Sequence, residues 1–213
     1  MPPSNPEQEH LRDVLELLER LHRHKDAAYG DAWRKRGEVI AIFANIARKY
    51  DRLVVGFGEQ RAAAGESLAD TVADLCVYAV KYLTWIAHEH PVDIDASGLP
   101  IPPAARISYS NGLVAVGEVF AAVLAAPAAP PGGTAQIWNR VQVAFGKLER
   151  GLMAQATPTS GSDDVPSYEV KAGLAWTLIQ DSAWLLVALD AEDAATLTKL
   201  RDEVDRMDRA VRR

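Results

Sequence analysis

The sequence has very little cysteine. Its 213 residues contain one, Cys76, so the chain cannot form an internal disulfide bond. Cys76 lies in the apolar run LCVYAV, where a cysteine usually serves as a small packing residue. A lone cysteine in such a run fits a protein of the reducing cytoplasm.

The sequence also lacks an excess of positive charge and any long apolar run. It has 23 lysine and arginine residues against 29 aspartate and glutamate residues, for a formal net charge of -6. This balance argues against general binding to nucleic acids or anionic membranes, which select basic surfaces. The first residues, MPPSNPEQEH, do not read as a signal peptide, and no apolar stretch of about 18 residues occurs. We therefore expect a soluble, cytoplasmic protein with no nucleic-acid or membrane partner.

Several catalytic signatures are missing as well. We find no Ser-His-Asp order, no zinc-ligand spacing and no glycine loop of the kind that cradles phosphates. Alternating strand patterns are absent too, whereas apolar residues recur at helical spacing along most of the chain. The pattern predicts an all-α helical bundle of about six to seven helices. Their expected ranges are 7–28, 31–53, 65–88, 109–126, 134–155, 167–189 and 191–212.

A proline-rich segment divides the chain. The stretch PVDIDASGLPIPPAARIS predicts a linker at residues 91–108, between an N-terminal half at 1–90 and a C-terminal half at 109–213. Shifting the sequence by 98 residues aligns RKYDRL (48–53) with GKLERG (146–151). Farther along, ESLADTVADL aligns with EVKAGLAWTL, so that Gly173 and Thr177 replace Asp70 and Asp74. The halves are interpreted as degenerate three-helix repeats that form a pseudo-dimer, the alternative being chance similarity between helices.

Three carboxylates recur every four residues in the stretch GESLADTVADLCVYAV. Glu66, Asp70 and Asp74 span an arc of roughly 80° on a helix and have no basic partners at the same spacing. Hard oxygen ligands of this kind suit Mg²⁺ or Mn²⁺. The alternative is a solvated acidic face, which is natural for Glu66 because a carboxylate in the first turn favours the helix dipole.

The preceding helix carries a second polar stripe. Glu38, Asn45 and Lys49 fall within about 40° of one another, and Arg52 lies close by. The stripe offers one more carboxylate for metal and cations for phosphate, provided that the two helices pack side by side. An ordinary solvated helix face is the alternative.

Aromatic residues accompany both stripes. Tyr29 and Trp33 precede the second helix, and Tyr78 continues the acidic flank of the third. Such rings stack on nucleobases, although aromatic residues at this spacing are also typical of a core.

Three motifs together resemble those of a known family. They are HKDAAYGDAWRKRG, IARKYDRL and ESLADTVADLCVYAV, and they cover about residues 22–86. They are similar to motifs of the small all-α nucleotide pyrophosphohydrolases of the MazG and dimeric dUTPase group. The similarity is greatest to a branch that reads K-x-x-x-YG-x-x-W, K-x-x-RL and E-S-x-x-D-x-x-x-DL-x-x-Y. The matching positions are Lys25, Tyr29, Gly30, Trp33, Lys49, Arg52, Leu53, Glu66, Ser67, Asp70, Asp74, Leu75 and Tyr78.

This resemblance implies Mg²⁺- or Mn²⁺-dependent cleavage of a nucleoside triphosphate to a monophosphate and pyrophosphate. Asp70 and Asp74 are then the expected metal ligands, and Glu66 is a ligand or the base that orients water. Glu38 supplies the acid from the neighbouring helix, so that Glu38 and Glu66 are the candidate catalytic residues.

Phosphate contacts are also implied. Lys49 and Arg52 are expected to face the phosphates, with Asn45, Tyr29, Trp33 and Tyr78 as the other candidate substrate-binding residues. Because related enzymes build their site from two subunits, a homodimer is one expected assembly. The better-known members carry a paired E-x-x-E, whereas here Ala41 stands three residues after Glu38. The alternative is therefore a catalytically weak helical module that binds a nucleotide or another protein.

Overall fold

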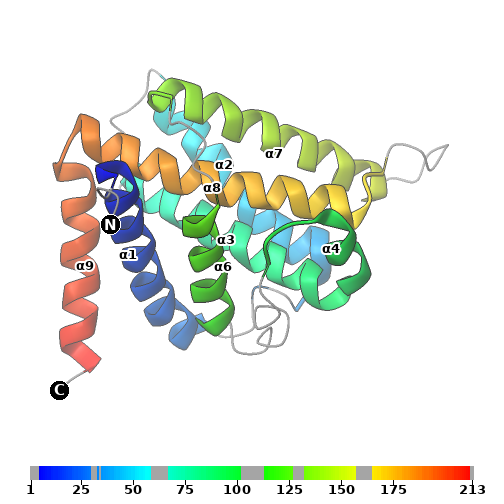
Figure 1. Cartoon of the computed structure of the whole chain (residues 1–213), viewed down its shortest axis with the longest axis horizontal. Helices are drawn as coiled ribbons and strands as arrows, with labels where there is room; N and C mark the ends of the chain where they lie inside the picture. The colour runs from blue at the N-terminus through cyan, green and yellow to red at the C-terminus, as the bar shows by residue number, and fades with distance from the viewer. Residues whose placement is uncertain are drawn as a thin grey trace.

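The chain folds into an all-α bundle. The computed structural model describes residues 5–29, 33, 35–58, 67–101, 113–126, 132–156 and 165–211, and in these ranges it contains helices and no strand. The prediction of fold class is confirmed. Figure 1 shows the elements, which are α1 (Pro6–Tyr29), the π-helical segment η2 (Glu38–Phe43), α2 (Ala44–Phe57), α3 (Leu68–Glu89), α4 (Pro91–Ser97), α6 (Leu113–Ala125), α7 (Thr134–Ala156), α8 (Tyr168–Glu192) and α9 (Ala195–Val211).

Each of the seven expected helices has a counterpart in the described ranges, although the one expected at 31–53 spans 38–57, and one further helix lies where a linker was expected. Proline and glycine at 91–98 bracket the short helix α4 instead of breaking the structure. Pro91 occupies the first turn, where its missing N–H costs no hydrogen bond, and Gly98 ends the helix with a left-handed φ of 64°. Ile94 anchors α4 in the core at 1% exposure. Residues 102–108 of the expected linker lie outside the described ranges.

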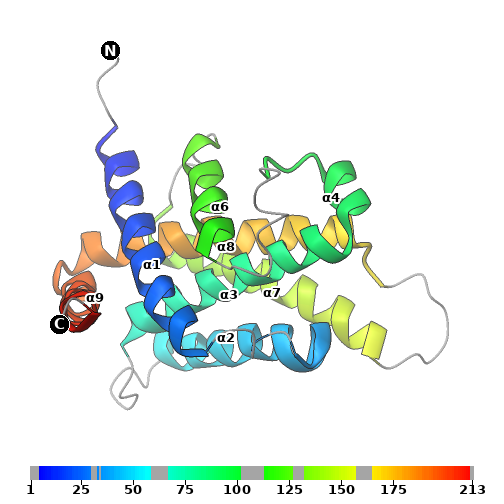
Figure 2. The same cartoon turned by 90° about the horizontal axis from the view of Figure 1, so that it is seen from below.

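Two long apolar helices form the centre of the bundle. α3 and α8 pack on each other more extensively than any other pair of helices in the described ranges. Figure 2 shows α2 and α7 on one side of this central pair and α1, α6 and α4 on the other. α8 is long and apolar enough to span a membrane by length and composition, but 72% of its apolar window is buried inside the bundle. It is therefore packed as the core helix of a bundle.

Aromatic rings join α2 to α7 on one side of the central pair. Tyr50 of α2 stacks on Phe145 of α7 with ring centroids 3.7 Å apart, and Phe57 stacks on Trp138 at 4.7 Å. Phe43 at the end of η2 also stacks on Phe145, at 5.7 Å. Stacked aromatic pairs contribute beyond the area they bury, so these contacts fix α2 against α7.

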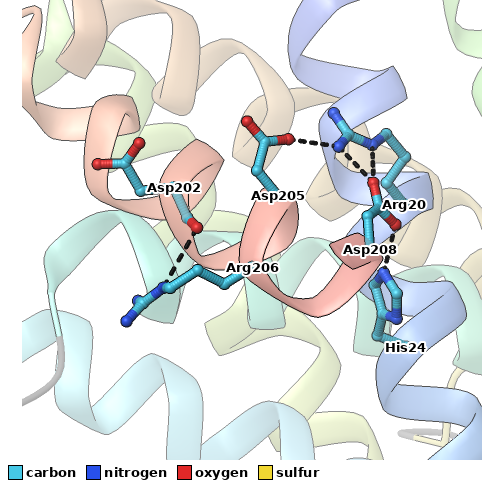
Figure 3. A network of polar contacts seen from close by, with 6 residues as sticks. All are labelled: Arg20, His24, Asp202, Asp205, Arg206 and Asp208. Carbon is cyan, nitrogen blue, oxygen red and sulfur yellow. Dashed lines mark hydrogen bonds and ion pairs between the residues drawn. The ribbon is translucent and has the colours of Figure 1, made fainter. Parts of the chain in front are cut away.

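The last helix is tied to the first. α9 buries Leu197, Leu200 and Val204, and its polar face meets α1 through the network drawn in Figure 3. The Arg20 guanidinium donates to Asp205 at 2.6 Å and to Asp208 at 2.5 Å. Hydrogen bonds from Arg20 and from His24, whose Nε2 lies 2.7 Å from Asp208, lower the pKa of the Asp208 carboxyl.

A buried ion pair joins the two halves of the chain. Glu38, at the start of η2, and Lys171, in α8, are 8% and 1% exposed, and Lys171 Nζ lies 3.1 Å from Glu38 Oε1. The Tyr82 hydroxyl donates to Oε1 at 2.5 Å and the Tyr168 hydroxyl to Oε2 at 3.1 Å. Burial, followed by the Glu38 charge, raises the pKa of Tyr82, which therefore stays a donor. Three donors thus satisfy one buried carboxylate.

We predict that removing one member of this pair destabilises the fold strongly. Lys171→Met leaves the Glu38 carboxylate buried without its cation, which should lower the free energy of unfolding by about 3–5 kcal/mol. Urea denaturation measures the loss, with Lys199→Met on the exposed face of α9 as the matched control. The double variant Glu38→Gln with Lys171→Met should lose less than the sum of the single changes. A Lys171→Met loss no larger than that of the control would contradict the account.

Candidate functional site

A pocket of about 570 Å³ opens between α1, α2 and α3. α2 packs directly on α3, as the prediction for the two polar stripes required. The side chains that line the pocket come from all three helices and from residue 33. They are His22, Lys25, Trp33, Asn45, Arg48, Lys49, Arg52, Asp74, Val77, Tyr78 and Lys81.

Most of the predicted substrate-binding residues meet in this pocket. Lys49, Arg52 and Asn45 reach it from α2, while Tyr78 reaches it from α3. Trp33 also lines it. Their convergence follows from spacing: residues 45, 49 and 52 share one face of a continuous α-helix, and residues 74, 78 and 81 share one face of the next. The side chain of Tyr29 lies outside the described residues.

Asp74 is the one acid among the described residues that line the pocket. The residue is 9% exposed, and its carboxylate lies between two lysines, with Lys25 Nζ 2.5 Å from Oδ1 and Lys49 Nζ 2.6 Å from Oδ2. Burial alone raises the pKa of Asp74, but the charges and hydrogen bonds of Lys25 and then Lys49 outweigh it, so that the pKa lies below its ordinary value. Asp74 is thus ionised near neutral pH and holds both lysines in place.

The pocket is also lined by three cations that were not predicted as site residues, Lys25, Arg48 and Lys81. Lys25 belongs to the family-like motif and was given no role, and Arg48 neighbours Lys49 on α2. Lys81 lies seven residues after Asp74, a spacing that places both on one face of α3 and could have identified it. Lys81 is 8% exposed, and its Nζ lies 5.2 Å from the Trp33 ring centroid and 5.9 Å from that of Tyr78. Cation–π contacts of this kind help to hold a buried ammonium group.

Local bonds orient the polar end of α2. The Asn45 amide donates to the carbonyl of Ala41 at 2.7 Å, and the Asn45 side-chain oxygen accepts a short hydrogen bond from Arg48. Burial, followed by the Asp74 charge, raises the pKa of Tyr78, so its hydroxyl remains protonated. The pocket therefore presents donors from lysine, arginine and tyrosine, with one carboxylate among its described lining residues.

Glu38 does not join the other acids, which corrects the prediction of one shared stripe. The prediction assumed continuous α-helix from residue 31, but residues 38–43 are π-helical. A π-helical turn contains about one more residue, which rotates Glu38 by about 100° relative to Asn45 and Lys49. Glu38 instead faces Tyr82, Tyr168 and Lys171 in the core. The π-helical start follows Gly37, whose φ of 78° favours glycine.

Asp70 has a local structural role. Its backbone N–H donates to the Ser67 hydroxyl at 3.1 Å, and its carboxylate accepts from the Ser67 backbone N–H at 3.2 Å. This capping box satisfies two free donors at the start of α3. Glu66 lies outside the described residues.

The described carboxylates do not make a ready metal site. No group of three or more histidine, cysteine, aspartate or glutamate side chains in the described ranges could hold a metal ion. The oxygens of Asp74 already bind Lys25 and Lys49, and those of Glu38 bind Lys171 and two tyrosines. The expected convergence of Glu38, Asp70 and Asp74 on one ion is therefore wrong for this arrangement of side chains.

Comparison with known proteins gives a partial similarity. No family model matches the chain, and no solved structure matches it. The chain is 31% identical over 108 residues to the "Gene 30 protein" of Bacillus phage SP01, in a match that covers 40% of this chain and 48% of that protein. The chain thus spans about half the length of the curated relative it matches.

We predict that Asp74 titrates below its ordinary pKa of 3.8 and that Lys49 contributes to the difference. Because the pKa is lower in the folded state, the charged form stabilises the fold above the ordinary value, and this stability is lost as pH falls through the lowered pKa. Lys49→Gln should raise the pKa of Asp74, whereas Lys199→Gln on α9 should leave it unchanged. A titration of the Asp74 ¹³Cγ resonance measures both. An unchanged pKa in Lys49→Gln would refute the assignment.

Proposed function

We propose that the pocket binds the phosphate groups of a nucleoside triphosphate. One observation carries the proposal: the described residues that line the pocket include five lysines and arginines and a single carboxylate. Cations in excess of anions attract a ligand with several negative charges, and partial burial strengthens each contact. The volume of about 570 Å³ is within the range of small-molecule sites. On this proposal, the acidic protein has a local cationic site.

Asp74 would hold the lysines ready for this ligand. Lys25 and Lys49 are fixed by the Asp74 carboxylate before the ligand arrives, which limits the side-chain entropy lost on binding. Arg48 and Arg52 approach from the same face of α2 and can bind phosphate oxygens with two parallel N–H groups. The phosphates would therefore lie along α2, close to Asp74.

Aromatic rings would hold the base. Trp33 and Tyr78 both line the pocket, and Lys81 lies within cation–π distance of each ring. Flat rings of this kind stack on any base, so the contact supports binding of nucleotides without selecting one. A triphosphate partner is consistent with the cytoplasmic location that we propose for a chain whose one cysteine is a buried free thiol.

We predict that affinity rises with the number of phosphates and depends on α2. Calorimetric titration in EDTA should show a non-hydrolysable nucleoside triphosphate binding more tightly than the diphosphate, and the nucleoside binding weakly. The double variant Lys49→Ala with Arg52→Ala should weaken triphosphate binding at least about tenfold, because each charge-assisted hydrogen bond contributes about 1.5–3 kcal/mol.

The matched control removes the same charges from α9. Lys199→Ala with Arg209→Ala alters two exposed residues and should leave the affinity unchanged. Equal affinity for the nucleoside and the triphosphate, or equal loss in the two double variants, would refute the proposal.

A second candidate is Mg²⁺-dependent hydrolysis of the same ligand to a monophosphate and pyrophosphate, as in the MazG-like enzymes that the motifs resemble. Asp74 favours it, since an ionised carboxylate lies beside Lys49 and next to the proposed phosphate position. A divalent ion would supply neutralisation of the phosphates and activation of a water molecule. The described acids do not form a metal site by themselves. Hydrolysis is therefore the second candidate, and binding is the first.

We predict for this candidate that pyrophosphate is released from at least one triphosphate in a panel of ribo- and deoxyribonucleotides with Mg²⁺ or Mn²⁺. Asp74→Asn should reduce the turnover at least about a hundredfold, the scale expected for a group that acts on the reacting phosphates. Circular dichroism checks that the variant is folded. Unchanged turnover in Asp74→Asn would exclude this site, and release from no triphosphate would leave binding as the function.

A further inference from the structure

A second groove, of about 420 Å³, lies between α7 and α8. The side chains and glycines that line it are Lys147, Arg150, Gly151, Pro166, Val170, Gly173, Leu174 and Thr177. We propose that this groove is a second anion site, which binds a phosphate group and is related to the first pocket by the internal repeat.

The packing scheme of the helices supports the repeat. Exchanging α1 with α6, α2 with α7 and α3 with α8 reproduces the main contacts. α3 packs on α8, α1 packs on α6, and the packing of α2 on α3 has its counterpart in that of α7 on α8. The contact of α1 with α8 likewise has its counterpart in that of α6 with α3. An approximate two-fold relation between the halves accounts for all of these contacts at once.

The burial pattern follows the same correspondence. Leu18, Leu21 and His22 of α1 are buried at the spacing at which Val116, Val119 and Phe120 of α6 are buried. Along α3 and α8, the aligned stretches ESLADTVADL and EVKAGLAWTL lead to helix ends at Glu89 and Glu192, the same number of residues later in each half.

The two cation sites fall on equivalent positions. Lys147 and Arg150 on α7 correspond to Lys49 and Arg52 on α2, and both pairs line a pocket against the next long helix. Asp74 corresponds to Thr177, which lines the second groove. The repeat therefore places a lysine and an arginine at equivalent positions in the pair α2 and α3 and in the pair α7 and α8.

Loss of the acid changes what the second groove can bind. The Thr177 hydroxyl donates to the carbonyl of Gly173 at 2.9 Å and offers no charge. Within the described ranges, no carboxylate pairs with Lys147 or Arg150, and both side chains are exposed. Two cations with no acid among the described lining residues favour an anion and disfavour a metal ion.

The inner part of the equivalent site is closed. Tyr78 and Lys81 correspond to Asp181 and Trp184, which are 4% and 3% exposed. Asp181 accepts a hydrogen bond from Arg140 at 2.8 Å. These residues occupy the region in which the first pocket would hold a base. The second groove is thereby limited to phosphate, either free or at the end of a larger molecule.

A glycine shapes the rim of the groove. A Cβ atom at Gly151 would lie 2.3 Å from Cγ of Pro166, so only glycine lets the segment before α8 approach α7 this closely. This approach brings Pro166 to the groove, against Gly151, the residue that follows Arg150.

The test uses inorganic pyrophosphate in EDTA with the full ¹⁵N-labelled chain, followed by two-dimensional NMR. Backbone amides of residues 147–151 and 170–177 should shift and saturate. In the double variant Lys147→Ala with Arg150→Ala, the apparent affinity for pyrophosphate obtained from these shifts should fall at least about tenfold. It should stay unchanged in Lys199→Ala with Arg209→Ala.

Shifts of equal size with chloride at matched ionic strength, or equal saturation in Lys147→Ala with Arg150→Ala, would overturn the proposal. The inference rests on the proposed function only for the chemistry of the first pocket. The experiment can refute the first site and the second site independently. A response at 147–151 but not at 45–52 would refute the first site and support the second. The reverse response would refute the second alone.

Discussion

The ion pair between Glu38 and Lys171 is the interaction on which the arrangement of this bundle depends. Both charges lie in the interface between the halves, where an unpaired charge would cost several kcal/mol. Glu38 also accepts hydrogen bonds from Tyr82 of α3 and Tyr168 of α8, so the start of the η2–α2 element is held against the central pair. Because this contact fixes the start of the η2–α2 element, it also directs the cationic face of α2 toward α1 and α3.

Neutralisation of a buried charge also explains how the side chains of the pocket are arranged. Asp74 is held between Lys25 and Lys49, and this arrangement stabilises the fold in the absence of ligand. A phosphate group would compete with Asp74 for the same lysines and release its carboxylate. The site thus combines structural ion pairs with proposed binding groups, and the excess of cations over Asp74 among the described lining residues supports the proposed anionic ligand.

Helical periodicity was sufficient to predict the bundle, because apolar spacing along each long helix reflects the face that it buries. It was also sufficient to bring Asn45 and Lys49 to one pocket with Asp74, since these residues lie on regular α-helix. It failed at Glu38, because nothing in the spacing indicates the π-helical segment that rotates it into the core. It failed at Asp70 as well, since a capping aspartate and a metal-binding aspartate have the same local pattern.

The most direct measurement of the central claim is a crystal structure with a non-hydrolysable nucleoside triphosphate analogue bound. We expect the phosphates to lie between α1, α2 and α3 within hydrogen-bond distance of Lys49 and Arg52, with at least one lysine moved from Asp74 toward a phosphate oxygen. A structure with the analogue bound elsewhere, and with Lys25 and Lys49 still on Asp74, would contradict the account.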